Sequence, residues 1–299
     1  MWLNTVGKIF HHPDTAFTSF LVRNEQDMKK MIVIIGMGEL GELFAHSFLK
    51  SGYPVYPVLR GMSLVAVANE IPEPELVLLA VGEKELHPEL ASLPECWRDR
   101  LALLQNELLP RDWHRHGILD PTIIVVWFDK KKDRPFTALL PSYIAGPKAA
   151  LITQALQLIE VPCFEISSEN LLFELVRKYL YILTVNIGGL SLSLGSTVHE
   201  LWNDHRQFAE TLVNEILDIQ EWLVQDQLPR DKLIAGLLEG FDADPTHICR
   251  GRTATERLHR VLNHAHQAGI KAPMLEEIAK EISTETWNPS LTQHTEPTL

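Results

Sequence analysis

Three glycines near the start of the chain follow an apolar run and could hold a phosphate. Gly36, Gly38 and Gly41 form a G-x-G-x-x-G motif after the run Ile32–Ile35, and an amphipathic stretch, Glu39–Lys50, begins inside the motif. In a strand–turn–helix unit such glycines allow a tight turn, close approach of the backbone to a pyrophosphate, and close packing of helix on strand. The motif predicts a dinucleotide site formed by Gly36, Met37, Gly38, Glu39, Leu40 and Gly41. The alternative is a glycine-rich turn that binds nothing.

The end of the second predicted strand indicates which dinucleotide would bind. An NAD site usually has Asp or Glu there, hydrogen-bonded to the ribose hydroxyls. In this chain the run YPVYPVLRG carries Arg60 at that position, with no acid nearby. A guanidinium can pair with the 2′-phosphate of NADP through charge-assisted hydrogen bonds. Arg60 therefore predicts NADP as the cofactor, the alternative being a solvated surface arginine.

Several motifs in order resemble the ketopantoate reductase family, which reduces a 2-oxo acid with NADPH in pantothenate synthesis. The motifs are GMGELG with the trailing Arg60, LLQNE at 103–107, FELVRKYLYILTVNIGGLSL, and GRTATERLHRVLNHAHQAGIKAP at 251–273. The resemblance spans roughly residues 31–283. It implies an NADPH-dependent reductase of a 2-oxo acid that transfers hydride and uses a lysine as general acid.

The resemblance also implies roles for particular residues. Lys178 matches the family's general acid, Asn106 the residue between nicotinamide and substrate, and Glu256 the residue that orients the lysine and holds the substrate. Ile182 and Asn186 stand at the positions of two substrate-binding asparagines. On a helix, Lys178, Ile182 and Asn186 share one face because they are spaced four residues apart.

Each of these residues also has a purely structural interpretation. Lys178 could be a solvated helix lysine, Glu256 a carboxylate that favours a helix N-terminus, and Asn106 the end of a strand. The chain departs from the family at Ile182, at Glu107 in place of glycine, and at Gly82 in place of lysine. The family's Ser-Ser-Met-x-x-Asp segment is also not visible. These departures leave two other hypotheses open: a noncatalytic dinucleotide-binding sensor or accessory protein, and a related hydroxyacid or opine-type dehydrogenase.

The elements that position these residues form two blocks. Up to about residue 167, short apolar runs alternate with helical or turn segments, which is typical of an α/β domain; beyond it only helical patterns remain. The sequence predicts an appendage over 1–30, a Rossmann-type NADP-binding domain over 31–167, an all-helical substrate and dimerisation domain over 168–284, and a flexible tail over 285–299. The expected strands are Ile32–Ile35, Val55–Leu59, Leu76–Val81, Arg100–Leu104, Ile123–Phe128, Thr137–Leu140 and Cys163–Ile166. The expected helices include Glu39–Lys50, Pro147–Ile159, Ser167 to Ile187, Thr197–Gln225, Lys232–Glu239, Thr253–Ala268 and Met274–Ile282.

Composition limits the other function classes. The chain has 299 residues, 27 basic against 39 acidic, and a formal charge of −12, so nucleic acid is not an expected partner. Three scattered cysteines fit a reducing cytoplasm. Histidine spacing does not supply a metal site. The weakly polar run 179–198 contains too many small polar residues for a membrane span. We expect a cytoplasmic protein that acts on a small keto acid and that can form a homodimer.

Overall fold

The computed structural model describes residues 29–285, and a seven-stranded sheet forms its first half. The strands are β1 (Ile32–Ile35), β2 (Val55–Val58), β3 (Leu76–Leu79), β4 (Leu101–Leu103), β5 (Thr122–Val125), β8 (Ser142–Ala145) and β9 (Cys163–Glu165), in the order β2-β1-β3-β4-β5-β8-β9. The first five are parallel, β8 is antiparallel to β5, and β9 is parallel to β8. This confirms the predicted Rossmann-type sheet. Most of the predicted appendage and tail lie outside the described residues.

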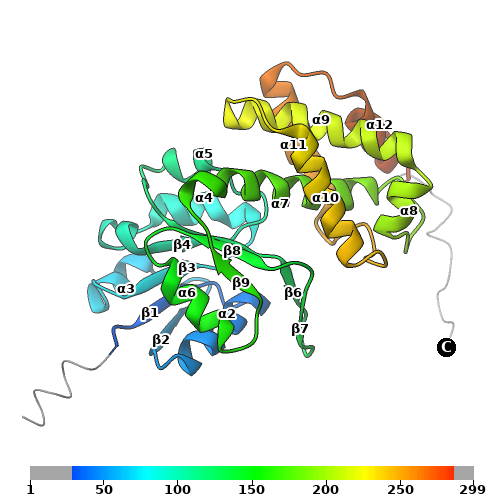
Figure 1. Cartoon of the computed structure of the whole chain (residues 1–299). Coiled ribbons are helices and arrows are strands. Elements are labelled where there is room, and N and C mark those ends of the chain that lie inside the picture. The colour runs from blue at the N-terminus through cyan, green and yellow to red at the C-terminus, as the bar shows by residue number, and fades with distance from the viewer. Residues whose placement is uncertain (1–28, 286–299) are drawn as a thin grey trace, which may run out of the picture.

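Helices cover both faces of this sheet (Figure 1). They are α2 (Glu39–Lys50), α3 (Leu64–Glu70), α4 (Glu83–Ser92), the short 3-10 helix η1 (Glu95–Arg100), α5 (Pro110–His114) and α6 (Ala149–Gln157). Successive side chains of a strand point to opposite faces. Accordingly, Ile32 and Ile34 pack in one core with α2 and α6, while Val33 and Ile35 pack in another with α3 and α4. The glycine motif, Arg60 and Asn106 follow the carboxyl ends of β1, β2 and β4.

A two-stranded hairpin, β6 (Phe128–Lys130) and β7 (Phe136–Ala138), projects away from the sheet beside α2 (Figure 1). The predicted strand Ile123–Phe128 is therefore present as β5, but it ends at Val125 rather than at Phe128. The chain leaves the sheet at Trp127, whose N–H donates to Ser142 Oγ at 2.9 Å and whose carbonyl accepts from Leu139 N at 2.8 Å. These bonds divert the backbone into the hairpin, whose tip is the basic run at 130–134.

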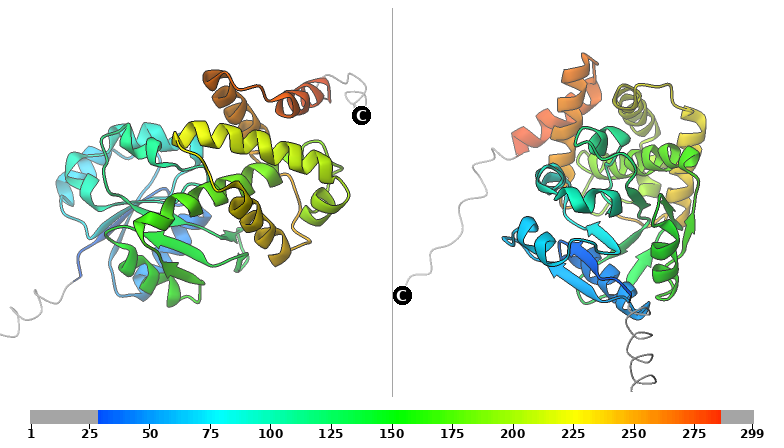
Figure 2. Two further views of the ribbon diagram at one scale, coloured as in Figure 1. Left: turned by 45° about the horizontal axis from the view of Figure 1, so that its top comes forward. Right: turned by 90° about the vertical axis from the view of Figure 1, so that its left-hand side faces the viewer.

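The second half of the described chain is helical, as predicted. It consists of α7 (Ser168–Gly188), α8 (Val198–Asn203), α9 (Arg206–Val224), α10 (Arg230–Ala243), α11 (Ala254–Ala268) and α12 (Pro273–Glu285). Helix α7 runs from the sheet into the helical part and packs against α9, α10 and α11 (Figures 1 and 2). Within residues 29–285, no helix is long and apolar enough to cross a lipid bilayer.

Two predictions about these helices are wrong. The expected single helix Thr197–Gln225 is broken between α8 and α9, where the Asn203 amide donates to the His199 carbonyl at 3.0 Å and Asp204 ends the first helix. Short polar side chains compete for backbone groups in this way. Gly240, expected near a helix stop, lies inside α10, where the absence of a side chain leaves room for the Tyr181 ring, 2.9 Å from where a Cβ would be.

Candidate active site

The glycine motif has the geometry of a phosphate cradle. Gly36 has a φ of +94°, and a Cβ there would lie 2.7 Å from the carbonyl oxygen of Ala80 on the neighbouring strand. A Cβ at Gly41 would overlap the carbonyl oxygen of Gly36, so helix α2 can approach β1 only with glycine at this position. Both glycines are therefore required by the turn itself.

The middle glycine serves a different purpose, because nothing lies near it. A Cβ at Gly38 would meet no atom within 4 Å, and Gly38 is the exposed N-cap of α2 with no side-chain cap. Unpaired N–H groups at such a helix start favour an anion. Gly38 opens onto a cleft of about 430 Å³, whose lining includes Gly36, Met37, Arg60, Met62, Val81, Glu85 and Glu89. The open space lies where a pyrophosphate would have to approach.

Arg60 lies in this cleft, immediately after β2. Its side chain is exposed and has no hydrogen-bond or ion-pair partner within residues 29–285. Glu85 and Glu89 line the same cleft, and Lys84 lies 3.7 Å from Glu85. An unpaired guanidinium at the end of the second strand has the position expected of a group that contacts the ribose phosphate.

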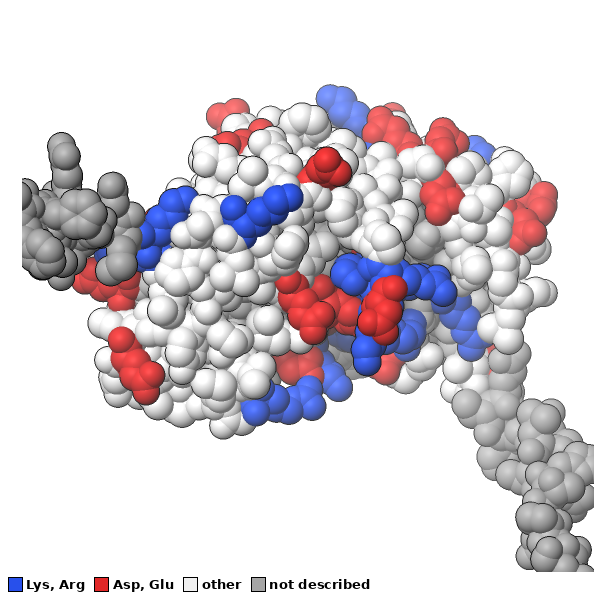
Figure 3. All heavy atoms as spheres, turned by 90° about the horizontal axis from the view of Figure 1, so that it is seen from below, with Lys and Arg blue, Asp and Glu red and all other residues white. Residues whose placement is uncertain are grey.

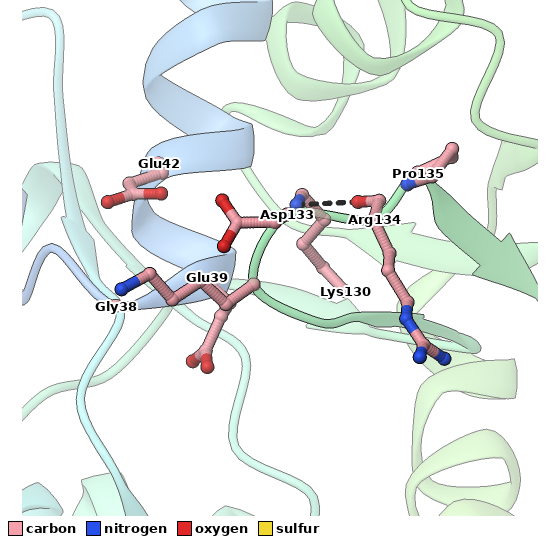
Figure 4. A pocket seen from close by; sticks show the side chains of 8 residues that line it. Gly38, Glu39, Glu42, Lys130, Asp133, Arg134 and Pro135 are labelled. Atoms are coloured by element: carbon pink, nitrogen blue, oxygen red, sulfur yellow. Dashed lines mark hydrogen bonds between the residues drawn. The ribbon is translucent and has the colours of Figure 1, made fainter.

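A second cavity, of about 690 Å³, lies between the start of α2 and the β6–β7 hairpin (Figure 4). It is lined by Gly38, Glu39, Glu42, Lys130, Lys132, Asp133, Arg134 and Pro135. Figure 4 shows the Asp133 carboxylate between the hairpin tip and α2, and Lys130 Nζ donates to the Arg134 carbonyl at 2.7 Å. Acidic and basic side chains intermingle on this face (Figure 3). Three cations and three carboxylates offset one another here, so the cavity has no net preference for an anion.

Leu40, another residue of the predicted dinucleotide site, is half-buried and packs into the core beneath α2.

Asn106 follows β4, in a segment that is fixed from several sides. Gln105 Nε2 donates to the carbonyls of Leu79 and Val81 at 2.9 and 3.2 Å, at the end of β3. Glu83 Oε1 accepts from the N–H groups of Asn106 and Glu107 at 2.6 and 3.3 Å. The Asn106 carboxamide itself has no hydrogen-bonding partner among the described residues. The backbone is held while the side chain stays available to a ligand.

The Glu83 carboxyl has an unusually high pKa. Burial, followed by the nearby Glu107 carboxylate, raises its pKa to about 7, although Arg257 and the Asn106 N–H act in the opposite direction. Glu83 is the first residue of α4 and directly follows Gly82, the position where the family resemblance leads one to expect lysine. The carboxylate thus positions the Asn106 segment.

Glu107, which stands where the resemblance implies glycine, joins the sheet to the helical part. Its carboxylate accepts from Arg257 Nη1 at 2.6 Å, Arg260 Nε at 2.9 Å and Arg260 Nη2 at 2.6 Å. The Glu107 and Arg257 side chains are only 7% and 9% exposed. A buried pair of this kind fixes geometry, because removing one partner leaves an uncompensated charge.

Lys178 is buried on α7, 8% exposed, with its ammonium against aromatic rings. Nζ lies 4.4 Å from the ring centre of Trp127 and 5.8 Å from that of Tyr181, and it has no hydrogen-bonding partner within residues 29–285. Burial, followed by the positive charge of Arg257, lowers its pKa to about 7, and Asp129 acts in the opposite direction. The interpretation as a solvated helix lysine is therefore wrong. A lysine tuned in this way suits proton transfer near neutral pH.

Within residues 29–285, neither Glu256 nor Asn186 forms a hydrogen bond or an ion pair with the Lys178 ammonium. Glu256 is exposed in the first turn of α11 and forms no hydrogen bond or ion pair with another described residue. Asn186 donates to the Ile182 carbonyl at 2.8 Å and accepts from Gly251 N at 2.9 Å, so it fastens a loop to α7. Ile182 is half-buried and packs against the core. The substrate roles of these three residues stay predictions.

Sequence reasoning missed the residues that contact the predicted site from distant parts of the sequence. Glu83, Trp127, Arg257 and Arg260 each contact a predicted site residue or its neighbour. One signal was present: Arg257 and Arg260 are three apart on a predicted helix and so share a face. The unexpected Glu107 needed such a partner.

Among the described residues, no group of three or more His, Cys, Asp or Glu side chains is placed to hold a metal ion.

Comparison with known proteins identifies the fold. No family model and no curated protein sequence matches the chain. Among solved structures, 2-dehydropantoate 2-reductase from Methylococcus capsulatus is 15% identical with a TM-score of 0.60, over 86% of this chain and 98% of that one. D-mandelate dehydrogenase in complex with NADH and anilino(oxo)acetate is also 15% identical with a TM-score of 0.60, over 85% and 98%.

A third match is the dimeric ketopantoate reductase from Staphylococcus aureus, 13% identical with a TM-score of 0.54, over 85% of this chain and 98% of that one. Each alignment includes both the sheet and the helical part. Sequence identities this low establish only the shared fold, so the chemistry has to be argued from the residues of the site. The chain has the fold shared by the ketopantoate reductases and D-mandelate dehydrogenase, and its sequence is 13–15% identical to theirs.

Proposed function

We propose that this protein is an NADPH-dependent reductase of a 2-oxo acid. The observation that carries the proposal is one combination: an open glycine cradle at the sheet edge, and a buried lysine without a hydrogen-bond acceptor on the helix that follows the sheet. The fold supports it, because the ketopantoate reductases and D-mandelate dehydrogenase share both parts. The ligands in the D-mandelate dehydrogenase complex, NADH and anilino(oxo)acetate, are a reduced dinucleotide and an oxo acid.

The cradle residues fit a dinucleotide. Gly36 and Gly41 have no room for a side chain, whereas Gly38 faces open space, as a bound pyrophosphate requires. NADP is preferred over NAD in this proposal because Arg60 is exposed, unpaired within residues 29–285, and lines the same cleft. Asn106 would contact the nicotinamide side, since its segment follows β4 and its carboxamide is unpaired among the described residues.

The protein residues supply the acid and the positioning, and the bound dinucleotide would supply the hydride. The Lys178 ammonium would donate a hydrogen bond to the keto oxygen and stabilise the negative charge that develops there. Its proton then moves from Nζ to that oxygen, which becomes a hydroxyl group. The neutral amine regains a proton from water. With a pKa of about 7, Lys178 can both give and regain the proton near neutral pH.

The test is NADPH oxidation by the purified protein with a panel of 2-oxo acids, run beside Lys178→Met, which removes the ammonium and keeps the volume. We expect turnover by the wild type and a strong loss in the variant. Binding of NADPH without turnover of any 2-oxo acid would contradict the reductase proposal.

A noncatalytic dinucleotide-binding protein is the second candidate. It is favoured by one observation: the rings of Trp127 and Tyr181 lie against the ammonium, where a substrate could otherwise be. Under this alternative NADPH binds, no oxo acid is reduced, and Lys178→Met changes neither property.

We also propose a homodimer in the cytoplasm. The dimeric Staphylococcus aureus enzyme with this fold supports dimerisation, and the unpaired state of Cys96, Cys163 and Cys249 is compatible with a reducing compartment. Light scattering on the purified protein measures the mass directly: about twice that of the chain is expected, and a monomer at micromolar concentration would refute the dimer.

A further inference from the structure

Two buried cations lie on neighbouring helices of the candidate site. Lys178 on α7 is 8% exposed and Arg257 on α11 is 7% exposed, and these two helices pack directly against each other. The two groups interact electrostatically, since the charge of Arg257 disfavours the ammonium of Lys178. Burying like charges together is unfavourable unless a counter-charge is present.

The available carboxylates do not balance these cations. Glu107 is the carboxylate paired with Arg257, and it pairs with Arg260 as well. Burial and the Glu107 carboxylate raise the pKa of Glu83 to about 7, so Glu83 is only partly ionised near neutral pH. Asp129, which also influences Lys178, is an exposed residue of the hairpin. With Lys178 and Glu83 both partly ionised near pH 7, the lysine and the two arginines carry more positive charge than Glu83 and Glu107 can offset.

The unused hydrogen-bond donors belong to the same two residues. Arg257 donates from Nη1 to Glu107 at 2.6 Å and from Nε to Thr253 Oγ1 at 3.2 Å, which leaves Nη2 without a partner within residues 29–285. Lys178 Nζ contacts ring faces and has no acceptor among the described residues. Both donor atoms keep some contact with solvent, since neither is among the fully buried side-chain atoms that lack a partner. An anionic ligand can therefore reach two cationic donors whose side chains are otherwise buried.

We propose that Arg257 binds the carboxylate of the substrate and so places its 2-oxo group at Lys178. This inference rests on the proposed reductase function and adds the residue that selects an acid over a neutral carbonyl compound. In a 2-oxo acid the carboxylate carbon is bonded directly to the keto carbon. A carboxylate on the Arg257 guanidinium therefore brings the keto oxygen toward the neighbouring cation. The anchor is Arg257, which points inward, rather than the exposed Glu256 beside it.

A consequence follows for the general acid. A bound carboxylate offsets the charge of Arg257, so it favours the ammonium form and raises the pKa of Lys178 above about 7. The other charged or titratable groups that act on Lys178 are Asp129, which favours the ammonium, and His247, whose own pKa burial lowers. At pH 8 the free protein holds Lys178 mostly neutral, and binding of an anion takes up a proton. Binding of the substrate would thus favour protonation of Lys178, the general acid that acts on it.

The experiment is calorimetric titration of oxamate, a 2-oxo-acid mimic that is not reduced, into the protein saturated with NADP⁺ at pH 8. Oxamide, the neutral diamide of similar shape, is the ligand control. We expect oxamate to bind at least ten-fold more tightly than oxamide. Repeating the titration in buffers of different ionisation enthalpy should reveal uptake of up to one proton in the wild type and none in Lys178→Met.

Variants separate anion binding from structural support. Arg257→Gln should weaken oxamate binding at least ten-fold with NADPH affinity unchanged, and Arg257→Lys should restore part of the loss. Arg260→Gln is the matched control, since Arg260 shares Glu107 but is more exposed, and it should retain oxamate binding. Thermal melting establishes that each variant is folded.

The outcomes distinguish this inference from the function on which it rests. Equal effects of Arg257→Gln and Arg260→Gln, equal binding of oxamate and oxamide, or no oxamate binding by a protein that reduces 2-oxo acids would each overturn the inference. Failure of the wild type to bind NADPH would instead refute the proposed function.

Discussion

The cofactor edge and the lysine region of this molecule are built in opposite ways. At the cofactor edge the backbone forms the site: Gly36 and Gly41 create the turn, Gly38 leaves space, and Arg60 stands unpaired within residues 29–285. In the lysine region side chains form the site, through bonds such as Glu107 to Arg257, which are 150 residues apart in sequence. The cofactor edge is open to a ligand, whereas the lysine region is buried and its side chains are held by contacts within the protein.

Because the two regions are built differently, we expect mutations in them to have different effects. Changes at Gly38 and Arg60 should alter dinucleotide affinity with little effect on stability, because Gly38 faces open space and Arg60 is exposed. Changes in the lysine region should alter turnover or stability with little effect on dinucleotide affinity. The predictions below test that separation, from the largest expected effect to the smallest.

The largest effect is expected at Glu107, the carboxylate that joins the two regions. Glu107→Ala leaves the buried Arg257 without its ion pair, and breaking such a pair costs about 3–5 kcal/mol. Urea unfolding measures the loss. The control is Glu210→Ala, whose pair with Arg206 is about half-exposed on each side, and which should cost less than about 1 kcal/mol. Equal losses would show that the Glu107 pair does not hold the two parts together.

Removal of the general acid should have the next largest effect. Lys178→Met should lower kcat by about 100-fold or more, the range for loss of a positioned acid. NADPH affinity should stay unchanged, because Lys178 does not line the glycine cleft. An unaltered rate would mean that Lys178 is not the acid.

The pH profile tests the same residue. Lys178 must be protonated to act as an acid, and burial lowers its pKa to about 7, so kcat/KM should fall as pH rises through about 7. Glu83 titrates in the same range, so Glu83→Gln is the control. If the inflection disappears in Glu83→Gln, the glutamate and not the lysine controls the rate.

At the cofactor edge, Arg60→Ala should weaken NADPH binding by about 1–3 kcal/mol, the contribution of a charge-assisted pair, and leave NADH binding unchanged. Calorimetric titration of both nucleotides gives the comparison. If the wild type already binds NADPH and NADH equally, Arg60 does not read the ribose phosphate.

A smaller effect is expected at Ile182, which lies between Lys178 and Asn186 on α7. An apolar residue there cannot pair with a substrate hydroxyl, so the wild type should reduce ketopantoate poorly and prefer a more apolar oxo acid. Ile182→Asn should raise kcat/KM for ketopantoate about ten-fold, or about 1.4 kcal/mol. Because Ile182 packs against the core, melting should be measured alongside. Efficient turnover of ketopantoate by the wild type would refute this interpretation.

Sequence reasoning succeeded where local rules decide the structure. The bounds of β1 and α2 were predicted correctly, and Gly269 ends α11 with a φ of +66° as expected. The missed elements depend on tertiary contacts. Strand β8 escaped notice because it pairs antiparallel to β5 after a hairpin. The extension of α10 through Gly240 escaped notice because this glycine makes room for the Tyr181 ring and does not end the helix.

The same division applies to the candidate site. The glycine cradle and Arg60 could be read from a motif, because each works through its own backbone or its place after a strand. The surroundings of Lys178 could not, because they depend on Trp127 from a hairpin that the sequence pattern did not reveal. Resemblance directed attention to Glu256, while the fold turns the adjacent Arg257 inward.

The most direct test of the account is NADPH titration of Gly38→Asp against the wild type. Gly38 is a helix N-cap with extended backbone and open space around it, and aspartate is a favoured N-cap residue, so the variant should fold with an unchanged or slightly higher melting temperature. Its carboxylate would occupy the place proposed for the pyrophosphate. We predict one NADPH bound per wild-type chain and a loss of affinity of at least ten-fold in the variant. Unchanged NADPH affinity in a folded Gly38→Asp protein would contradict the account.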